Sequence, residues 1–246
     1  MLFRSAPMIR ISDDAAVRTI TLDRPEVLNA FDTALYRAAG AALEEARADD
    51  EVKVVVITGA GRAFSAGQDL AELERIASGE SYESGFPALL DALGAFDKPL
   101  IAAVNGVAVG IGFTMLAHCD LVFVAEGARM RTPFGELGVP PEAASSWLFP
   151  QRVGWQRAAH ILMANAWVSS EQAVEYGIAL ERVPDDEVVT RAQAEAAAIA
   201  RAPLAALRAI KTTMLDGQRE QVAAARRRED RAFAVTFGFD PAVLDD

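Results

Sequence analysis

The sequence predicts an α/β fold with a helical C-terminal region, and three observations lead to this prediction. Two apolar runs rich in β-branched residues, VKVVVITG (52–59) and LIAAVNG (100–106), have the composition of strands buried on both faces. Each run ends in a glycine-rich loop that leads into a helical pattern, as in parallel βα units. Beyond Gly138 the strand pattern fades, and the last quarter of the chain is mostly helical in pattern.

The N-terminal third supplies the first predicted strand and helix. Residues 17–22 have the composition of a short strand, and residues 23–26 (DRPE) form a turn. Asp32 is placed to cap a helix over 32–50, because its carboxylate can accept the free N–H groups of a first helical turn. A polar helix over 71–78 follows the first glycine loop.

The middle of the chain repeats this order of strand and helix. We expect a helix over 86–95, which the Lys-Pro pair at 98–99 ends, and a short helix over 110–118 after the second strand run. Two further strands are expected at 121–126 and 129–134.

Helices dominate the remaining chain. Ser169 and Gln172 have the spacing of a capping box, and Gly177 marks the end of that helix. We divide the chain into a core of residues 1–190 and a C-terminal helical region of residues 191–246.

Composition excludes several classes of protein. A chain of 246 residues with 52% apolar residues is globular, and a net charge of −11 argues against a nucleic-acid partner. Cys119 is the one cysteine, so no internal disulfide is possible and a cytoplasmic location is expected. Residues 100–117 approach the length of a membrane span, but Asn105 and three glycines interrupt them, so we expect no membrane span. With one cysteine and two histidines in the chain, we expect no structural zinc site and no other metal.

The two glycine loops, GAGRAFSAGQD (59–69) and NGVAVGIGFT (105–114), do not match phosphate-binding patterns. Both lack the third glycine of G-x-G-x-x-G, and neither contains the Gly-Lys-Ser/Thr end of a P-loop. Two interpretations stay open. Backbone N–H groups at two such strand ends can point at one oxygen as an oxyanion hole, or the glycines serve only tight turns and close packing.

Together these segments resemble the crotonase family, the enoyl-CoA hydratase/isomerase superfamily, over residues 15 to 235. The matching stretches are DRPEVLNAF (23–31), VVVITGAGRAFSAGQDL (54–70), KPLIAAVNGVAVGIGFTMLAHCDLVFVAE (98–126), TPFGELGVPPEAASSWLFPQRVG (132–154) and SSEQAVEYGIALERV (169–183). The resemblance implies a spiral of ββα turns, a helical C-terminal trimerisation region, and homotrimers or hexamers built from two trimers. It also implies an acyl-CoA thioester as substrate, with coenzyme A as part of that substrate and no other cofactor.

The resemblance assigns site residues to both glycine loops. It makes the backbone N–H groups of Gln68 and Ile111 the two donors to the thioester oxygen, with Gly110 beside the substrate. The coenzyme A nucleotide is expected to contact residues of the DRPEVLNAF loop and of the loop around residue 66: Arg24, Val27, Ala30, Ala66, Asp69 and Leu70. For Arg24 the alternative is a surface ion pair, and for Asp69 it is a helix N-cap. Lys211 is either a phosphate partner or, the favoured interpretation, a solvated lysine.

Departures from the family pattern bear on the reaction. Hydratases of this family use two glutamates at the positions of Thr114 and Phe134, and neither side chain here can act as a general base. Glu142, in PEAASS (141–146), resembles the single base of Δ3,Δ2-enoyl-CoA isomerases. Phe134 is expected to line a dry apolar pocket with residues 147–149, which would raise the pKa of Glu142. The alternative for Glu142 is an acid that stabilises a helix N-terminus.

Three functions therefore stay open. The favoured one is an enoyl-CoA isomerase. The second is another crotonase-type enzyme, a hydratase or thioester hydrolase, for which Glu136 is the available second acid. The third is an acyl-CoA binding protein without catalysis. His118 is expected to have a structural role.

Overall fold

Two sheets form the centre of the structure, a computed structural model that describes residues 8–78 and 83–237. Neighbouring strands of the six-stranded sheet run parallel, except that β1 pairs antiparallel with β2. In spatial order its strands are β1 (Ile9–Asp14), β2 (Val17–Leu22), β3 (Val54–Gly59), β5 (Leu100–Val104), β7 (Leu121–Ala125) and β10 (Glu181–Val183). Every residue of β3 and β5 is buried, as their composition predicts.

A second, four-stranded sheet is made of short strands. In spatial order these are β4 (Ala63–Ser65), β6 (Val107–Val109), β8 (Arg129–Arg131) and β9 (Val168–Ser169). The chain passes from the large sheet to the small one in each successive turn, from β3 to β4, from β5 to β6 and from β7 to β8. The predicted spiral of ββα turns is confirmed.

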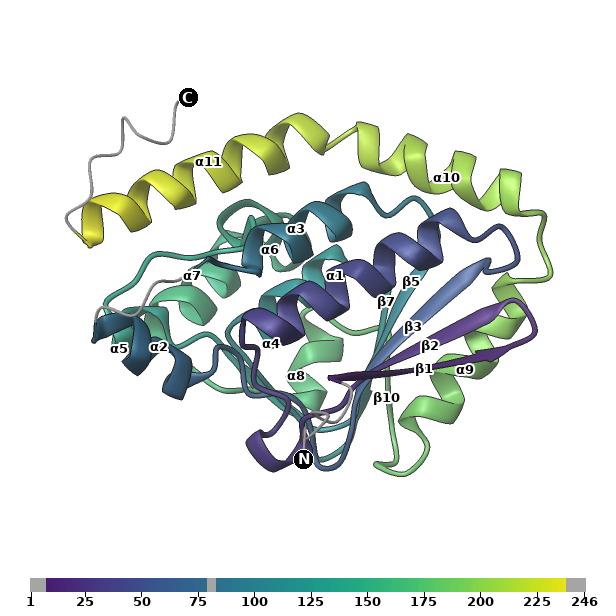
Figure 1. Cartoon of the computed structure of the whole chain (residues 1–246), viewed down its shortest axis with the longest axis horizontal. Coiled ribbons are helices and arrows are strands. Elements are labelled where there is room, and N and C mark those ends of the chain that lie inside the picture. The colour runs from purple at the N-terminus through teal and green to yellow at the C-terminus, as the bar shows by residue number, and fades with distance from the viewer. Residues whose placement is uncertain (1–7, 79–82, 238–246) are drawn as a thin grey trace, which may run out of the picture.

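Helices cover both sheets. They are α1 (Thr33–Ala48), α2 (Leu70–Ala77), α3 (Phe86–Ala95), α4 (Ile111–Thr114), α5 (Phe134–Leu137), α6 (Ser145–Val153), α7 (Trp155–Ala164), α8 (Ser170–Glu175), α9 (Val188–Ile199), α10 (Leu204–Asp216) and α11 (Arg219–Thr236), with 3-10 turns η1 (Pro25–Val27) and η2 (Met115–His118). Figure 1 shows α1 and α3 above the large sheet, and α10 and α11 as the outermost layer across the top. The helix α11 packs against α6, which begins beside Glu142.

Local sequence signals set several helix ends. Asp32 caps α1, because its side chain accepts the Leu35 N–H at 2.8 Å. Ser169 and Gln172 form the predicted capping box at the start of α8.

Two strands differ from the prediction. The strand expected over 129–134 ends at Arg131, because the chain turns at Pro133 into the short helix α5. The strand β1 was not predicted, because it is an edge strand whose burial pattern is almost wholly exposed and so shows no buried alternation.

The boundary predicted at 190/191 falls inside α9. The buried Ala192 and Ala196 of that helix lie on the face that packs against β3, β5 and β7, so α9 is part of the core by its contacts. The residues that lie beyond the core in Figure 1 are those of α10 and α11.

Among residues 8–78 and 83–237 no helix is long and apolar enough to cross a membrane. The same residues contain no cluster of histidine, cysteine and acidic side chains that could hold a metal ion.

Candidate functional site

The two glycine loops meet at Gly67 and Gly110. A Cβ atom added to Gly67, whose φ is +90°, would lie 2.7 Å from the Val109 oxygen and 3.6 Å from the Gly110 nitrogen. Only glycine allows this approach of backbone to backbone. The next residue of each loop, Gln68 and Ile111, is therefore brought to the same place. In the part of the chain that the structure describes, neither of their backbone N–H groups donates to a backbone oxygen.

Side chains around Gln68 fix this end of the loop. The Tyr36 hydroxyl donates to Gln68 Oε1 at 2.9 Å, and Gln68 Nε2 donates to Glu72 Oε2 at 3.0 Å. Glu72 is buried and also accepts the backbone N–H of Thr33 at 2.9 Å. The side chain of Gln68 is thus held by contacts from α1 and α2.

The loop over 24–31 is joined to the loop over 66–69 by backbone hydrogen bonds. Phe31 N–H donates to the Gly67 oxygen at 2.7 Å, and Asp69 N–H donates to the Phe31 oxygen at 2.9 Å. Asn29, fully buried at φ +56°, donates from Nδ2 to the oxygens of Ala60 and Ala63. The two loops predicted to hold a nucleotide therefore form one continuous wall.

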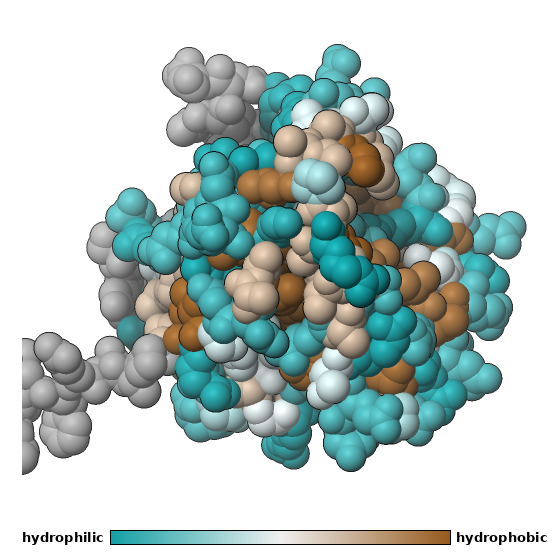
Figure 2. Space-filling view, turned by 90° about the vertical axis from the view of Figure 1, so that its right-hand side faces the viewer, coloured by the Kyte–Doolittle hydropathy of each residue, from teal (hydrophilic) through white to brown (hydrophobic). Residues whose placement is uncertain are grey.

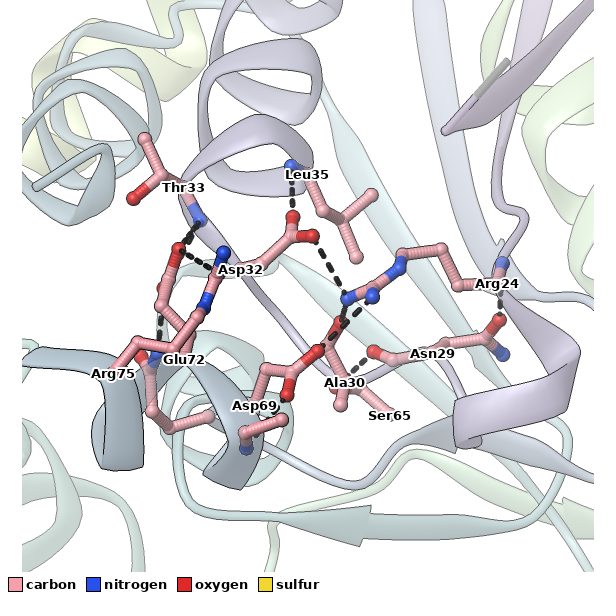
Figure 3. A network of polar contacts seen from close by, with 12 residues as sticks. Arg24, Asn29, Ala30, Asp32, Thr33, Leu35, Ser65, Asp69, Glu72 and Arg75 are labelled. Atoms are coloured by element: carbon pink, nitrogen blue, oxygen red, sulfur yellow. Dashed lines mark hydrogen bonds and ion pairs between the residues drawn. The ribbon is translucent and has the colours of Figure 1, made fainter. Parts of the chain in front are cut away.

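The positive charge of Arg24 is paired with carboxylates of the same chain. Its guanidinium lies between the carboxylates of Asp32 and Asp69, at 3.3 and 3.0 Å, and donates to the Ala30 oxygen at 2.6 Å (Figure 3). Only 15% of the side chain is exposed. The ion-pair alternative for Arg24 is what the structure contains, and its pair is half-buried between loops rather than on the open surface.

The other predicted nucleotide contacts differ in accessibility. Val27 and Leu70 are exposed, Ala66 is half-buried, and the Ala30 side chain is buried. Asp69 pairs with Arg24 and also accepts the Ala71 N–H at 3.0 Å in the first turn of α2, as the N-cap alternative expects.

Glu142 carries a carboxylate with one satisfied and one free oxygen. The Thr114 hydroxyl, on α4, donates to Oε1 at 2.5 Å. The Oε2 atom is buried and has no hydrogen-bond partner. Burial raises the pKa of Glu142 to about 8; the Thr114 hydrogen bond opposes that rise, and the negative charge of Glu229 adds to it. A carboxyl group with such a pKa is suited to act as a base near neutral pH.

The turn after Glu142 has unusual backbone geometry. Ala143 and Ala144 both adopt the left-handed conformation, with φ of 58° and 57°. Each costs an alanine about 1–2 kcal/mol, so surrounding contacts must hold it. The Glu229 carboxylate, buried on α11, accepts the N–H groups of Ala144 at 2.7 Å and of Ser146 at 2.9 Å. The His118 Nε2 atom lies 2.8 Å from the Ala143 oxygen.

An apolar cavity of about 400 Å³ adjoins this turn. Phe134 lines it together with Val139, Pro141, Pro150, Leu162 and Met163. The three residues expected to line a pocket with Phe134 do not line this cavity. Leu148 and Phe149 are buried in the core, and Trp147 packs against it.

Glu136 and Lys211 lie outside the candidate site. Glu136 is exposed and forms an ion pair with Arg131 on the surface. The expectation that Lys211 is solvated is wrong. Its side chain is 6% exposed, and its Nζ lies 2.7 Å from Oδ2 of Asp120, the residue before β7.

Sequence reasoning did not identify Glu229 as a site residue. Glu229 lies in a run of charged residues, RRREDR, whose composition is that of a solvated helix face. It contacts the turn after Glu142 only because α11 crosses α6, a contact between residues 85 positions apart. His118 has the structural contact that was expected for it.

Two glycine loops that meet backbone to backbone, a spiral of two sheets and a half-buried glutamate define an α/β protein of the crotonase type. A sequence model of the family described as Enoyl-CoA hydratase/isomerase matches residues 12–240. The chain belongs to this family of acyl-CoA enzymes.

Relatives carry both kinds of activity in their names. A probable enoyl-CoA hydratase of Rhodobacter capsulatus is 37% identical over 82% of this chain and 79% of its own. Enoyl-CoA delta isomerase 2 of Rattus norvegicus is 32% identical over 90% of this chain and 58% of its own. The crystal structure of an enoyl-CoA hydratase from Mycobacterium marinum, 45% identical, superposes with a TM-score of 0.81 over 85% of this chain and 99% of that one.

Proposed function

We propose that this protein is a Δ3,Δ2-enoyl-CoA isomerase, which moves the double bond of a 3-enoyl-CoA thioester to position 2. The observation that carries the proposal is the Glu142 carboxyl group, with Oε1 held by Thr114 and Oε2 buried without a partner. Glu142 has a raised pKa. Isomerisation adds no water, so a single base is sufficient. The positions where the family's hydratases carry glutamates hold Thr114 and Phe134, both buried.

The reaction uses one proton and one carboxylate. Glu142 removes a proton from C2 of the substrate, and the electron pair moves through the thioester carbonyl to give a dienolate. The N–H groups of Gln68 and Ile111 donate to the dienolate oxygen, and each such donor is worth about 3–4 kcal/mol in the transition state. Glu142 then returns its proton to C4, which leaves the double bond between C2 and C3.

The remaining parts of the substrate have candidate positions. The acyl chain fits the apolar cavity that Phe134 lines beside the Glu142 turn. The nucleotide of coenzyme A lies along the wall formed by the loops over 24–31 and 66–70, where Val27 and Leu70 are exposed. Gly110 leaves room for the thioester, and no cofactor beyond the substrate's own coenzyme A is required for the proton transfer.

We further propose that the protein assembles as a homotrimer or a hexamer of two trimers. Exposed apolar residues on α10 and α11, namely Ile210, Met214, Phe233 and Val235, support an interface formed by these helices. Figure 2, which views the side of the molecule on the right of Figure 1, shows apolar side chains reaching the surface among polar ones.

A second candidate is a hydratase, favoured by the name of the Rhodobacter capsulatus relative. It needs a second acid-base group, and Glu136 is exposed and paired with Arg131. A spectrophotometric assay of the conjugated thioester separates the candidates. Absorbance that rises with a 3-enoyl-CoA and stays constant with a 2-enoyl-CoA supports the isomerase. Loss of absorbance with the 2-enoyl-CoA means hydration, and binding of both substrates without turnover means an acyl-CoA binding protein.

A further inference from the structure

Side chains form hydrogen bonds with both polar groups of the peptide between Ala143 and Ala144. Its carbonyl oxygen lies 2.8 Å from His118 Nε2, and its N–H donates to Glu229 Oε2 at 2.7 Å. The C=O and N–H of a trans peptide point in opposite directions, so the two side chains approach from opposite sides. Both alanines flanking this peptide group are in the left-handed conformation.

We propose that His118 and Glu229 are positioning residues for Glu142, which clamp the Ala143–Ala144 peptide group and thereby set where the Glu142 carboxylate points. The inference rests on the proposed function, in which Glu142 is the base. Neither residue touches the substrate in this account. They act through the backbone of the turn that carries the base.

The Glu142 side chain leaves the backbone at the start of this turn, and among the described residues one hydrogen bond holds its carboxylate. Its Oε1 has the Thr114 hydroxyl, and its Oε2 has no partner. The direction of the carboxylate therefore depends on the Thr114 hydrogen bond and on the backbone that carries the side chain, and that backbone leads at once into two strained residues. Strained conformations persist only where surrounding contacts over-determine them.

Both clamp residues have the chemistry that the role requires. Burial lowers the pKa of His118 to about 4, so the ring is neutral at pH 7 and its Nε2 carries the proton donated to the Ala143 oxygen. Glu229 is an acceptor at both oxygens, and its Oε1 also holds the Ser146 N–H at 2.9 Å.

The clamp joins three parts of the chain next to Glu142: the turn after that residue, the segment of α4 and η2, and the helix α11. His118 ends η2, which continues directly from α4, the helix that carries Ile111 and Thr114. Glu229 comes from α11 in the C-terminal helical region. The peptide group thus ties the base to the segment that supplies one thioester-oxygen donor, and it ties both to the outer helices.

The test compares matched variants in 3-enoyl-CoA isomerisation. Glu229→Gln keeps the shape of the side chain but replaces one acceptor by an NH₂ group that faces a backbone N–H. His118→Leu removes the ring donor, whereas His118→Gln can supply an N–H at the place of Nε2.

We expect kcat to fall roughly 10- to 100-fold in Glu229→Gln and His118→Leu, as for a base displaced by part of an ångström. KM is expected to change less than about 3-fold, since the substrate contacts are intact. His118→Gln recovers most of the rate, and Glu220→Gln, exposed on the same helix, retains it.

A double-mutant cycle separates positioning from general damage to the fold. In a Glu142→Gln background, Glu229→Gln is expected to cause no further loss of kcat, because the residue acts only through Glu142. A further loss of similar size in that background overturns the clamp. If Glu229→Gln and His118→Leu both keep the kcat of the wild type, the clamp is also overturned. The proposed function then still holds, provided that Glu142→Gln is inactive. If Glu142→Gln retains the wild-type rate, the proposed function fails and the clamp fails with it. Should Glu229→Gln not fold, the comparison of His118→Leu with His118→Gln decides.

Discussion

The Thr114 hydroxyl donates a 2.5 Å hydrogen bond to Oε1 of Glu142, across 28 positions of sequence. The position at which the family's hydratases place a glutamate thus holds a donor to the carboxylate proposed as the base. The hydrogen bond favours the ionised form of Glu142 and lowers its pKa, against the larger opposite effect of burial.

Removing this hydrogen bond is expected to raise the pKa of Glu142 further. In Thr114→Val the shape is nearly kept but the donor is lost, and a hydrogen bond to a charged group is worth about 1.5–3 kcal/mol, or roughly 1–2 pKa units. We expect kcat/KM at pH 7 to fall about 10- to 100-fold, and the midpoint of the pH profile to move upward by roughly 1–2 pH units. Thr114→Ser, which retains a hydroxyl, is the control. Equal profiles for the valine and serine variants would contradict the role of the hydroxyl.

The pH dependence of the wild-type enzyme follows from the same group. A base must be ionised to remove a proton, and burial places the pKa of Glu142 at about 8. Below that pH we expect kcat/KM, which reports the free enzyme, to rise about tenfold per pH unit and then to level off. Initial rates between pH 5.5 and 9.5 with a 3-enoyl-CoA provide the check. A profile that is flat from pH 6 to 8, or that declines, is incompatible with this base.

The Ile111 N–H can be removed without changing a side-chain acid or base. Ile111 is the first residue of α4, a position where proline is tolerated in helices because its N–H makes no intrahelical bond. We expect Ile111→Pro to lower kcat about 10²- to 10³-fold, the usual loss for one oxyanion donor. Ile111→Val keeps the N–H and most of the buried side chain, so it serves as the control. A folded proline variant with the kcat of the valine variant excludes Ile111 as a donor.

Glu142 is expected to destabilise the fold as pH rises. Its pKa is about 8 in the folded chain against 4.5 as the ordinary value. Below the lower pKa both the folded and the unfolded chain hold the proton, so Glu142 does not change the stability with pH there. Between the two values the unfolded chain binds fewer protons, so the free energy of unfolding declines with increasing pH. Glu142→Gln has no such proton. We expect its free energy of unfolding to exceed that of the wild type by roughly 2–4 kcal/mol at pH 8, and to equal it at pH 4.5. Urea unfolding at the two pH values measures this difference, and its absence at pH 8 would show that the carboxyl is not buried.

The strands at the centre of the sheet could be predicted because their cause is local. Residues 54–59 and 100–104 are β-branched or apolar throughout, which only a strand covered on both faces accommodates. The edge strand β1 has no such pattern, since nearly all its side chains are exposed. In the site, Glu142 and the glycine loops could be found from their motifs.

Long-range contacts could not be predicted in this way. The ion pair of Lys211 with Asp120 and the contact of Glu229 with Ala144 join helices of the C-terminal region to the core. No local pattern distinguishes a lysine or a glutamate that will be buried by such a contact from one that stays in solvent. Tertiary packing alone decides which of these side chains is held at the site.

The isomerisation of a 3-enoyl-CoA by Glu142→Gln decides whether Glu142 is the base. Glutamine keeps the shape of the side chain and can still accept from Thr114, but it cannot remove a proton. We expect kcat to fall by about 10²- to 10⁴-fold, the usual contribution of a general base, while the affinity for an unreactive acyl-CoA stays within about 3-fold of the wild type. A Glu142→Gln enzyme that isomerises at the wild-type rate would show that the proton is carried by another group.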